Sequence, residues 1–377
     1  MIRKKGATLG TLFFVLFPCH KAVPRIATEL SQILKDKIRA EGPITFRDFM
    51  SSALFHETYG FYTQAPSIGN PAGPFDTSAK FTAFAFGVAQ AISQATKLIG
   101  GPLRVLELGG GTGQLGASIV SFLSVPHEYV ILEISEGLRR KQAERMLKTV
   151  PTLHELEAGP TLVFGNEVLD ALPVHRVMGL ANEEVCELYV DLDEDGEFCE
   201  QPGDLSTPTL LQRLRNENIH LGRGHIAELC LELSSFLQDI KRIVKPGYII
   251  FVDYGDKASN IYSHHHRNGT LRSYYQQQQV HDPFFAVGQQ DMTADVDFSA
   301  VISEASLLGL ELAGWTSQGI WLANLGIHNY VGTGKDSIAR QREVDVLTGE
   351  ASLGSAFDVI MLKTPGLPDG PGLGSVT

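Results

Sequence analysis

Apolar positions in the first hundred residues recur at helical spacing. They predict three helices, over residues 27–40, 46–55 and 81–99. Gly42-Pro43 ends the first pattern, and Thr45 is a candidate N-cap for the second. Residues 59–74 are rich in Gly, Pro and aromatic side chains, which is typical of a loop. The segment 26–100 is therefore expected to be a helical region with a loop that covers another part of the molecule.

Short apolar runs of strand length appear after residue 100 and alternate with helical patterns. Strands are expected at 103–108, 129–132, 161–164 and 248–252, and helices at 114–123 and 138–148. This alternation predicts parallel βαβ units and an α/β fold with a doubly wound, mostly parallel, Rossmann-like sheet within residues 101–364. Such sheets bind ligands beyond the carboxyl ends of their strands, so the residues that follow each run are candidates for function.

Three further regions depart from this alternation. Residues 183–218 are polar and irregular, which indicates an inserted hairpin and loop with a solvated acidic run. Residues 255–300 form a long polar, aromatic-bearing stretch that is expected to add a substrate region. The Gly/Pro-rich end, 365–377, is expected to be a disordered tail.

Composition and charge narrow the class of protein. The chain has 377 residues, 43% of them hydrophobic, which suits a globular enzyme with a large core. A formal net charge of -12 argues against nucleic acid as a partner. The four cysteines form no C-x-x-C pair, and the adjacent His264-His265-His266 is better explained as a loop, so no metal site is expected. No apolar run is long enough to cross a bilayer, and the sequence does not indicate an oligomeric state.

The N-terminus resembles a targeting segment. Arg3, Lys4 and Lys5 precede a short apolar run over 9–17, and no acidic residue occurs before Glu29. Residues 1–25 are thus either a transit peptide, which would place the protein in the mitochondrial matrix, or an unstructured extension of a cytoplasmic, bacterial protein.

A glycine loop follows the strand expected at 103–108. The sequence Glu107-Leu-Gly-Gly-Gly-Thr-Gly113 leads into a helix, and the segment from Gly111 to Gly116 also satisfies the dinucleotide pattern G-x-G-x-x-G. A pyrophosphate at that helix start would be opposed by the carboxylate of Glu107. S-adenosylmethionine carries an ammonium and a cationic sulfur and no phosphate, so Glu107 favours it as the cofactor. Glu133, after the next strand, can accept hydrogen bonds from ribose hydroxyls of either ligand.

A second polar segment, Asn166-Glu-Val-Leu-Asp-Ala-Leu-Pro173, follows the strand at 161–164. Glu167 and Asp170 are three residues apart, so one helical turn would bring both carboxylates to one face. If the methyl acceptor is a guanidinium, such carboxylates would grip it and favour a reactive nitrogen. The alternative is that Asn166 or Asp170 only caps a helix.

The chain resembles the MidA family, the family of the mitochondrial complex I assembly arginine methyltransferase and its bacterial relatives. The resemblance extends from about Ile26 to His328. It rests on Gly42-Pro-Ile-Thr-Phe46, Asp48-Phe-Met50, Gly60-Phe-Tyr62, Thr77-Ser78, Glu107 to Gly113, Ile131-Leu-Glu133, Gly165-Asn-Glu-Val-Leu-Asp-Ala-Leu-Pro-Val174, Asp253-Tyr-Gly255, Gly269-Thr-Leu-Arg272, Asp291-Met-Thr293 and Val296-Asp-Phe298.

The resemblance implies a seven-stranded methyltransferase sheet with an added subdomain. It also implies a protein arginine acceptor on a subunit of NADH:ubiquinone oxidoreductase (complex I). By position, the cofactor-binding residues would be Glu107, Gly109, Gly111, Gly113 and Glu133. The catalytic residues facing the acceptor would be Asn166, Glu167 and Asp170, and further substrate residues would be Asp253, Tyr254, Thr270 and Arg272.

The sequence departs from the family at one motif and leaves three other functions open. Pro74 replaces the Asp of the usual G-D-F-x-T-S, and Ala79-Lys-Phe81 replaces the usual P-E-I, which puts the lid over the cofactor and the acceptor in doubt. The alternatives are a small-molecule methyltransferase, an NAD(P)-dependent oxidoreductase and a non-catalytic complex I assembly factor.

Overall fold

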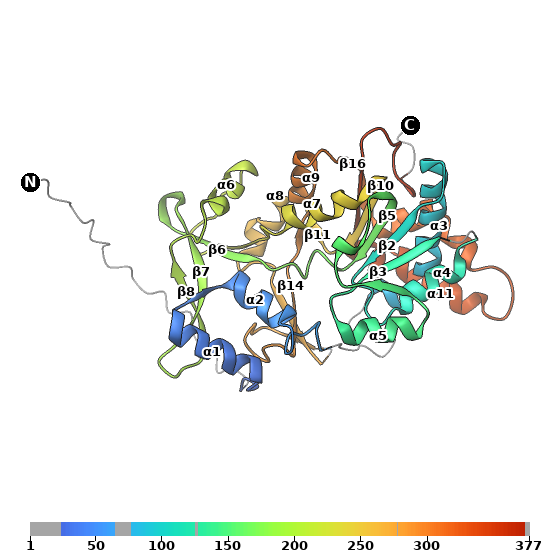
Figure 1. The fold of residues 1–377 in the computed structure, drawn as a ribbon. Coiled ribbons are helices and arrows are strands. Elements are labelled where there is room, and N and C mark those ends of the chain that lie inside the picture. The colour runs from blue at the N-terminus through green and yellow to red at the C-terminus, as the bar shows by residue number, and fades with distance from the viewer. Residues whose placement is uncertain (1–23, 65–76, 125–126, 277, 374–377) are drawn as a thin grey trace, which may run out of the picture.

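A twisted central sheet organises the larger part of the molecule in the computed structural model, which describes residues 24–64, 77–124, 127–276 and 278–373 (Figure 1). Its strand order is β16-β17-β10-β5-β2-β3-β4. In that order the strands are Glu311–Ser317, Asp358–Lys363, Val244–Asp253, Gly159–Asn166, Arg104–Leu108, Glu128–Leu132 and Lys148–Val150. The strands from β10 to β4 are parallel, and β17 is antiparallel to both of its neighbours. The predicted doubly wound α/β fold and the seven-stranded sheet are confirmed.

Helices cover both faces of this sheet because alternate strand residues point to opposite sides. Val105 and Phe164 belong to the core under one group of helices, and Leu106 and Val163 belong to the core under the other. The first group is α3 Thr82–Ile99, α4 Gln114–Phe122, α10 Gln318–Asn324, α11 Ser337–Thr348 and α12 Leu353–Ala356. The second group is α7 Leu233–Ile243 and α9 Phe298–Leu307. The buried strands therefore read as continuous apolar runs, as the sequence shows.

A second, antiparallel sheet lies at the other end of the molecule (Figure 1). Its strands are β1 Ile44–Thr45, β7 Val185–Leu192, β6 His175–Gly179 and β9 Ile226–Leu229, with β8 Phe198–Gly203 paired to β7. Helices α1 Glu29–Glu41 and α2 Phe46–Phe55 share a core with β7 and β8, and α6 Pro208–Asn216 shares another with β6 and β9. The hairpin expected at 183–218 is present, but it belongs to this larger sheet.

Smaller elements join the two sheets. Strands β12 Arg272–Tyr275, β13 Gln278–Val280 and β14 Asp291–Thr293 form a three-stranded sheet, and β11 Gly255–Asp256 pairs with β15 Val296–Asp297. The remaining short helices are α8 Ala258–Ile261, η1 Ser78–Lys80, η2 Leu153–Glu155, η3 Ala181–Glu183, η4 His264–His266 and η5 Ile327–Tyr330. Among the described helices, none is both long enough and apolar enough to cross a bilayer.

The N-terminal helices agree closely with the prediction. Helix α2 spans the predicted 46–55, and the Thr45 hydroxyl accepts a hydrogen bond from the Asp48 N–H at 3.0 Å, as an N-cap does. Helix α1 begins after Thr28, which forms a reciprocal capping box with Ser31. Residues 1–23 of the expected leader lie outside the described residues.

Two expectations need correction. The helix expected at 138–148 is α5, Glu136–Glu144, and after a short turn Lys148–Val150 form the edge strand β4. The tail expected to be disordered is packed over residues 365–373: the Trp321 indole N–H donates to Pro371 O at 3.0 Å, and Asn324 Nδ2 donates to Gly372 O at 3.0 Å. The buried Trp321 indole N–H needs a partner, and a carbonyl oxygen of the tail provides it. Residues 374–377 lie outside the described part.

Candidate active site

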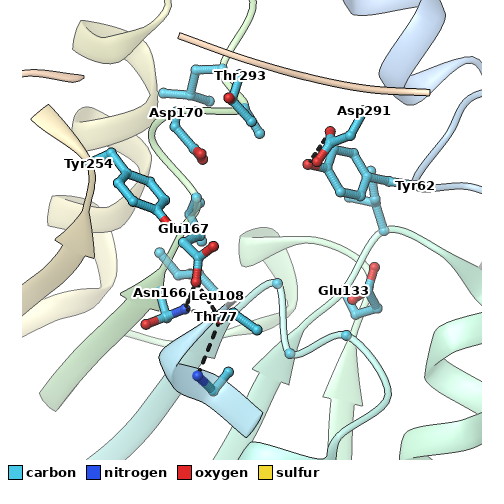
Figure 2. Close-up of a pocket in the computed structure, with 18 of the residues that line it drawn as sticks. Tyr62, Thr77, Leu108, Glu133, Asn166, Glu167, Asp170, Tyr254, Asp291 and Thr293 are labelled. Atoms are coloured by element: carbon cyan, nitrogen blue, oxygen red, sulfur yellow. Dashed lines mark hydrogen bonds between the residues drawn. The ribbon is translucent and has the colours of Figure 1, made fainter. Parts of the chain in front are cut away.

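A cavity of about 1040 Å³ opens beyond the carboxyl ends of β2, β3 and β5. Its wall includes the glycine loop, residues 107–112, and the segment 166–173. Tyr254, Arg272 and Asp291 from the linking elements complete it. Figure 2 shows Glu133 on one side of this space, with Asn166 and Glu167 on another. The cavity thus brings four of the predicted cofactor residues, Glu107, Gly109, Gly111 and Glu133, together with the predicted acceptor residues, whereas Gly113 does not line it.

The glycine loop requires glycine for geometric reasons. Gly109, Gly111 and Gly113 have positive φ angles of 64°, 50° and 77°, a region that is strained for residues with a Cβ. Gly113 precedes α4, whose start has no side-chain cap. The N–H groups at this helix start therefore remain available to a ligand.

Glu107 lies directly beneath this loop. Its carboxylate is 3% exposed and accepts a hydrogen bond from the Tyr129 hydroxyl at 3.0 Å. Burial raises the pKa of Glu107 to about 7. A Cβ added to Gly116 would stand 2.6 Å from Glu107 Oε2, so the first turn of α4 is fitted against this carboxylate. A buried carboxylate next to the cavity suits a cationic ligand, because a positive charge offsets the cost of its burial.

Glu133 follows β3 and faces the same cavity. Its Oε1 accepts the Ser135 N–H at 2.9 Å, while Gln142 Nε2 donates to Gly111 O at 2.7 Å and lies 3.4 Å from Glu133 Oε2. Gln142 therefore ties the end of β3 to the glycine loop. Burial raises the pKa of Glu133. The position at a strand end suits acceptance of two ribose hydroxyls, so these residues fit the adenosine and methionine parts of S-adenosylmethionine.

The acceptor side begins with a strained turn after β5. Glu167 has a φ of 53°, which is rare for a non-glycine residue, and its N–H donates to Val252 O at 2.9 Å. The Glu167 carboxylate accepts hydrogen bonds from Asn166 Nδ2, at 2.6 Å, and from the Thr77 hydroxyl. Strain of this kind persists only where the surroundings fix it, and it is common at active sites.

Asp253, at the end of β10, holds this turn in place. Its Oδ2 accepts the N–H groups of Val168 at 3.1 Å, Leu169 at 2.8 Å and Asp170 at 3.4 Å. Burial and the nearby charge of Glu167 raise the pKa of Asp253 to about 7. The side chain is 1% exposed and does not line the cavity. The prediction that Asp253 contacts the substrate is corrected: its carboxylate faces backbone N–H groups, and it positions the turn.

Asp170 does line the cavity, and it is 5% exposed. Burial raises its pKa well above the ordinary value, and the charges of Asp253, Glu167 and Asp291 raise it further. Sequence reasoning gave no role to Asp291 or to Tyr62, whose hydroxyl donates to Asp291 Oδ1 at 2.8 Å. Both lie in segments that carry the family resemblance, which was the only signal for them. The acceptor side therefore holds more carboxylates than predicted.

The other predicted substrate residues divide into two groups. Tyr254 and Arg272 line the cavity, and the Arg272 guanidinium lies 5.9 Å from the centre of the Tyr254 ring. Arg272 also forms an ion pair with Asp295. Thr270 does not line the cavity. Its N–H donates to the buried Glu228 at 2.8 Å. Its predicted substrate contact is corrected to a structural role in the loop that carries Arg272.

Two other sequence observations concern this region. In the described part of the chain, no cluster of three or more His, Cys, Asp or Glu side chains could hold a metal ion. Pro74, which departs from the family motif, lies outside the described residues. Thr77 and Ser78 of the same motif are described, and Thr77 contacts Glu167 directly. Part of the motif therefore reaches the acceptor side.

Comparisons with known proteins agree with this site. Residues 87–316, more than half of the chain, match a family described as S-adenosyl-L-methionine-dependent methyltransferase. A Caenorhabditis elegans protein named as a mitochondrial homologue of the protein arginine methyltransferase NDUFAF7 is 27% identical, over 84% of this chain and 80% of its own. Mitochondrial NDUFAF7 of Rattus norvegicus is 25% identical, over 89% of this chain and 84% of its own.

A solved structure shares the whole fold. It is a superfamily member from Burkholderia thailandensis, described as a "likely methyl transferase" and bound to S-adenosyl-homocysteine. The TM-score is 0.84 at 28% identity, with 93% of this chain and 97% of the other covered. The cofactor inferred from Glu107 is thereby confirmed, and the nicotinamide alternative is set aside. The chain belongs to the MidA family of S-adenosyl-L-methionine-dependent methyltransferases.

Proposed function

We propose that this methyltransferase acts on arginine side chains of a protein, a subunit of NADH:ubiquinone oxidoreductase. The observation that carries the proposal is the excess of buried negative charge on the acceptor side of the cavity. Glu167, Asp170 and Asp291 line it, whereas Arg272 is already paired with Asp295. A cationic acceptor would neutralise this charge, and a guanidinium also has five N–H donors to offer.

For methyl transfer to a guanidinium, the chain must orient the acceptor nitrogen, accept a proton and limit access of water. S-adenosylmethionine, held by Glu107, the glycine loop and Glu133, would supply the methyl group for a guanidinium nitrogen, with its sulfur as the leaving group. Glu167, fixed by Asn166 and Thr77, can orient that nitrogen. One N–H proton must leave, and Asp170, with its raised pKa, is suited to accept it. Burial of these groups limits access of water.

The relatives support the protein acceptor and its location. Their names describe protein arginine methyltransferases of mitochondria. We therefore extend the proposal to the mitochondrial matrix for this chain, in line with its basic, acid-poor N-terminus. A cytoplasmic, bacterial setting is the alternative for the same activity.

Transfer of a labelled methyl group tests this proposal. Purified protein is incubated with S-adenosylmethionine labelled in the methyl group and with complex I subunits, and the products are analysed by mass spectrometry. The proposal expects label on arginine nitrogens of one subunit. Label found only in a small molecule would instead indicate a small-molecule methyltransferase. Cofactor binding without any labelled product would indicate a non-catalytic assembly factor.

A further inference from the structure

Asp291 faces the cavity across from the turn that carries Asp170 (Figure 2). It begins β14 and is 5% exposed. The Tyr62 hydroxyl and the Met292 N–H both donate to its Oδ1, at 2.8 Å and 2.9 Å. Its Oδ2 accepts no hydrogen bond from the residues that the structure describes. One carboxylate oxygen is thus held in place, and the other is left for a ligand.

The carboxylate of Asp170, across the cavity from Asp291, also has oxygens without a hydrogen-bond donor from the described chain. It is 5% exposed, it lines the cavity, and no described residue donates a hydrogen bond to either of its oxygens. Carboxylate oxygens that face a cavity without a donor from the described chain can accept hydrogen bonds from a ligand, so two such carboxylates around one cavity indicate a ligand with several donors.

The charges of Asp170 and Asp291 also indicate a cationic ligand. The charge of Asp291 contributes to the raised pKa of Asp170, so the two groups interact across the cavity. The charge of Arg272 lowers the pKa of Asp170, but less than the other groups raise it, and the Arg272 guanidinium is already paired with Asp295. The space between the carboxylates therefore favours a positive charge.

We propose that Asp291, oriented by Tyr62, is a second acceptor-binding carboxylate, so that the acceptor guanidinium is held from two sides, by Asp170 and by Asp291. The inference rests on the proposed arginine acceptor and specifies how that acceptor is recognised. A guanidinium is planar and carries N–H donors on opposite edges, which lets it reach two separated carboxylates at once. The three donors of a lysine ammonium all lie on one nitrogen, so the same arrangement selects arginine over lysine.

The two sides come from different parts of the fold. Asp170 belongs to the turn after a strand of the central sheet, whereas Asp291 and Tyr62 belong to the small three-stranded sheet and to the segment after α2. Tyr62 has a strongly raised pKa because of burial and the charge of Asp291, so its hydroxyl keeps its proton and remains a donor. Tyr62 is therefore a positioning residue, and it acts through Asp291.

Steady-state kinetics with an arginine peptide, taken from the labelled subunit, test the inference. We expect Asp291→Asn to raise the peptide KM about 10- to 100-fold, because a charged hydrogen-bonding partner is lost. The cofactor Kd and kcat should change far less. Tyr62→Phe should raise the peptide KM several-fold. This variant removes only one hydroxyl, so it keeps the test possible if Asp291→Asn does not fold. Both variants should also methylate the matched lysine peptide relatively better than the wild type does.

The matched control is Asp282→Asn. Asp282 pairs with Arg25 and does not line the cavity, so the peptide KM should stay at the wild-type value. A normal peptide KM in Asp291→Asn, with only kcat reduced, would overturn the inference and leave the proposed function intact. If wild-type protein methylates no arginine peptide, the proposed function and this inference both fail.

Discussion

The cofactor side of the cavity takes its residues from one stretch of chain, 107–142, whereas the acceptor side gathers residues from widely separated segments. Glu107 lies in β2, Glu133 follows β3 and Gln142 lies in α5, and their hydrogen bonds reach partners close in sequence: Tyr129 for Glu107, and Gln142 for both Glu133 and Gly111. Glu167 instead depends on Thr77, and Asp291 on Tyr62, which lies 229 positions earlier. With the roles proposed here, cofactor binding would be a local property, whereas acceptor binding would depend on how the whole chain folds.

The strongest way to separate the two sides is Asp170→Asn. We expect kcat/KM to fall about 1,000-fold, because a base and a guanidinium partner are lost together. S-adenosylhomocysteine should bind as it does to the wild type, since Asp170 belongs to the turn after β5 and forms no hydrogen bond with Glu107 or Glu133. Calorimetry and a methyl-transfer assay check both halves, with the exposed Asp239→Asn as control. Parallel losses of cofactor affinity and turnover would contradict the view that the cofactor side and the acceptor side bind independently.

Gly116→Ala tests the local, cofactor side. The new Cβ would meet Glu107 Oε2 at 2.6 Å and the Tyr129 ring at 3.1 Å. We expect the protein to lose about 1–3 kcal/mol of unfolding free energy through overpacking, and to bind S-adenosylhomocysteine more weakly. Gly101→Ala is the matched control, because a Cβ there would meet nothing within 4 Å. Equal melting temperatures and cofactor affinities for the two variants would show that the loop tolerates this change.

Asp253→Asn tests whether the acceptor turn needs its clamp. The amide oxygen can still accept a hydrogen bond, but the charge facing three backbone N–H groups is lost, so we expect kcat to fall about tenfold. Hydrogen exchange should speed up at residues 168–170, and cofactor affinity should be retained. Protection of these amides at the wild-type level would argue against the positioning role.

The smallest expected effect is a dependence on pH. The pKa of Glu107 is about 7 in the folded protein, above its ordinary value of 4.5, because the group is buried. Its contribution to stability is therefore fully present below about pH 4.5 and is lost as the pH rises through about 7. We expect the melting temperature of ligand-free protein to decline over this window, and less so in Glu107→Gln. Identical slopes for the two proteins would contradict the assignment.

Local patterns in the sequence were sufficient to predict the strand, loop and helix on the cofactor side of the cavity. The strand that contains Glu107, the glycine loop and the helix after it follow from periodicity and backbone geometry, and Thr45 is the N-cap that the sequence predicted. The antiparallel sheet could not be predicted in the same way. Its strand Ile44–Thr45 is two residues long and pairs with Val190 and Tyr189, far along the chain.

The acceptor side shows why residue type alone did not fix residue roles. Asp170 and Asp253 both follow predicted strands and were both expected to face the acceptor, but Asp253 turns toward backbone N–H groups while Asp170 faces the cavity. Tyr62 and Asp291 gain their roles only from each other. Such pairings depend on tertiary contacts, which a single sequence does not display.

The most direct measurement is the affinity of the protein, saturated with S-adenosylhomocysteine, for a pair of peptides. One peptide carries the target arginine, and the other carries citrulline, which is similar in shape but neutral. The account predicts that calorimetry will detect binding of the arginine peptide, much weaker binding of the citrulline peptide, and loss of this difference in Asp170→Asn. Equal affinity of the wild-type protein for the two peptides would contradict a site built to hold a cationic acceptor.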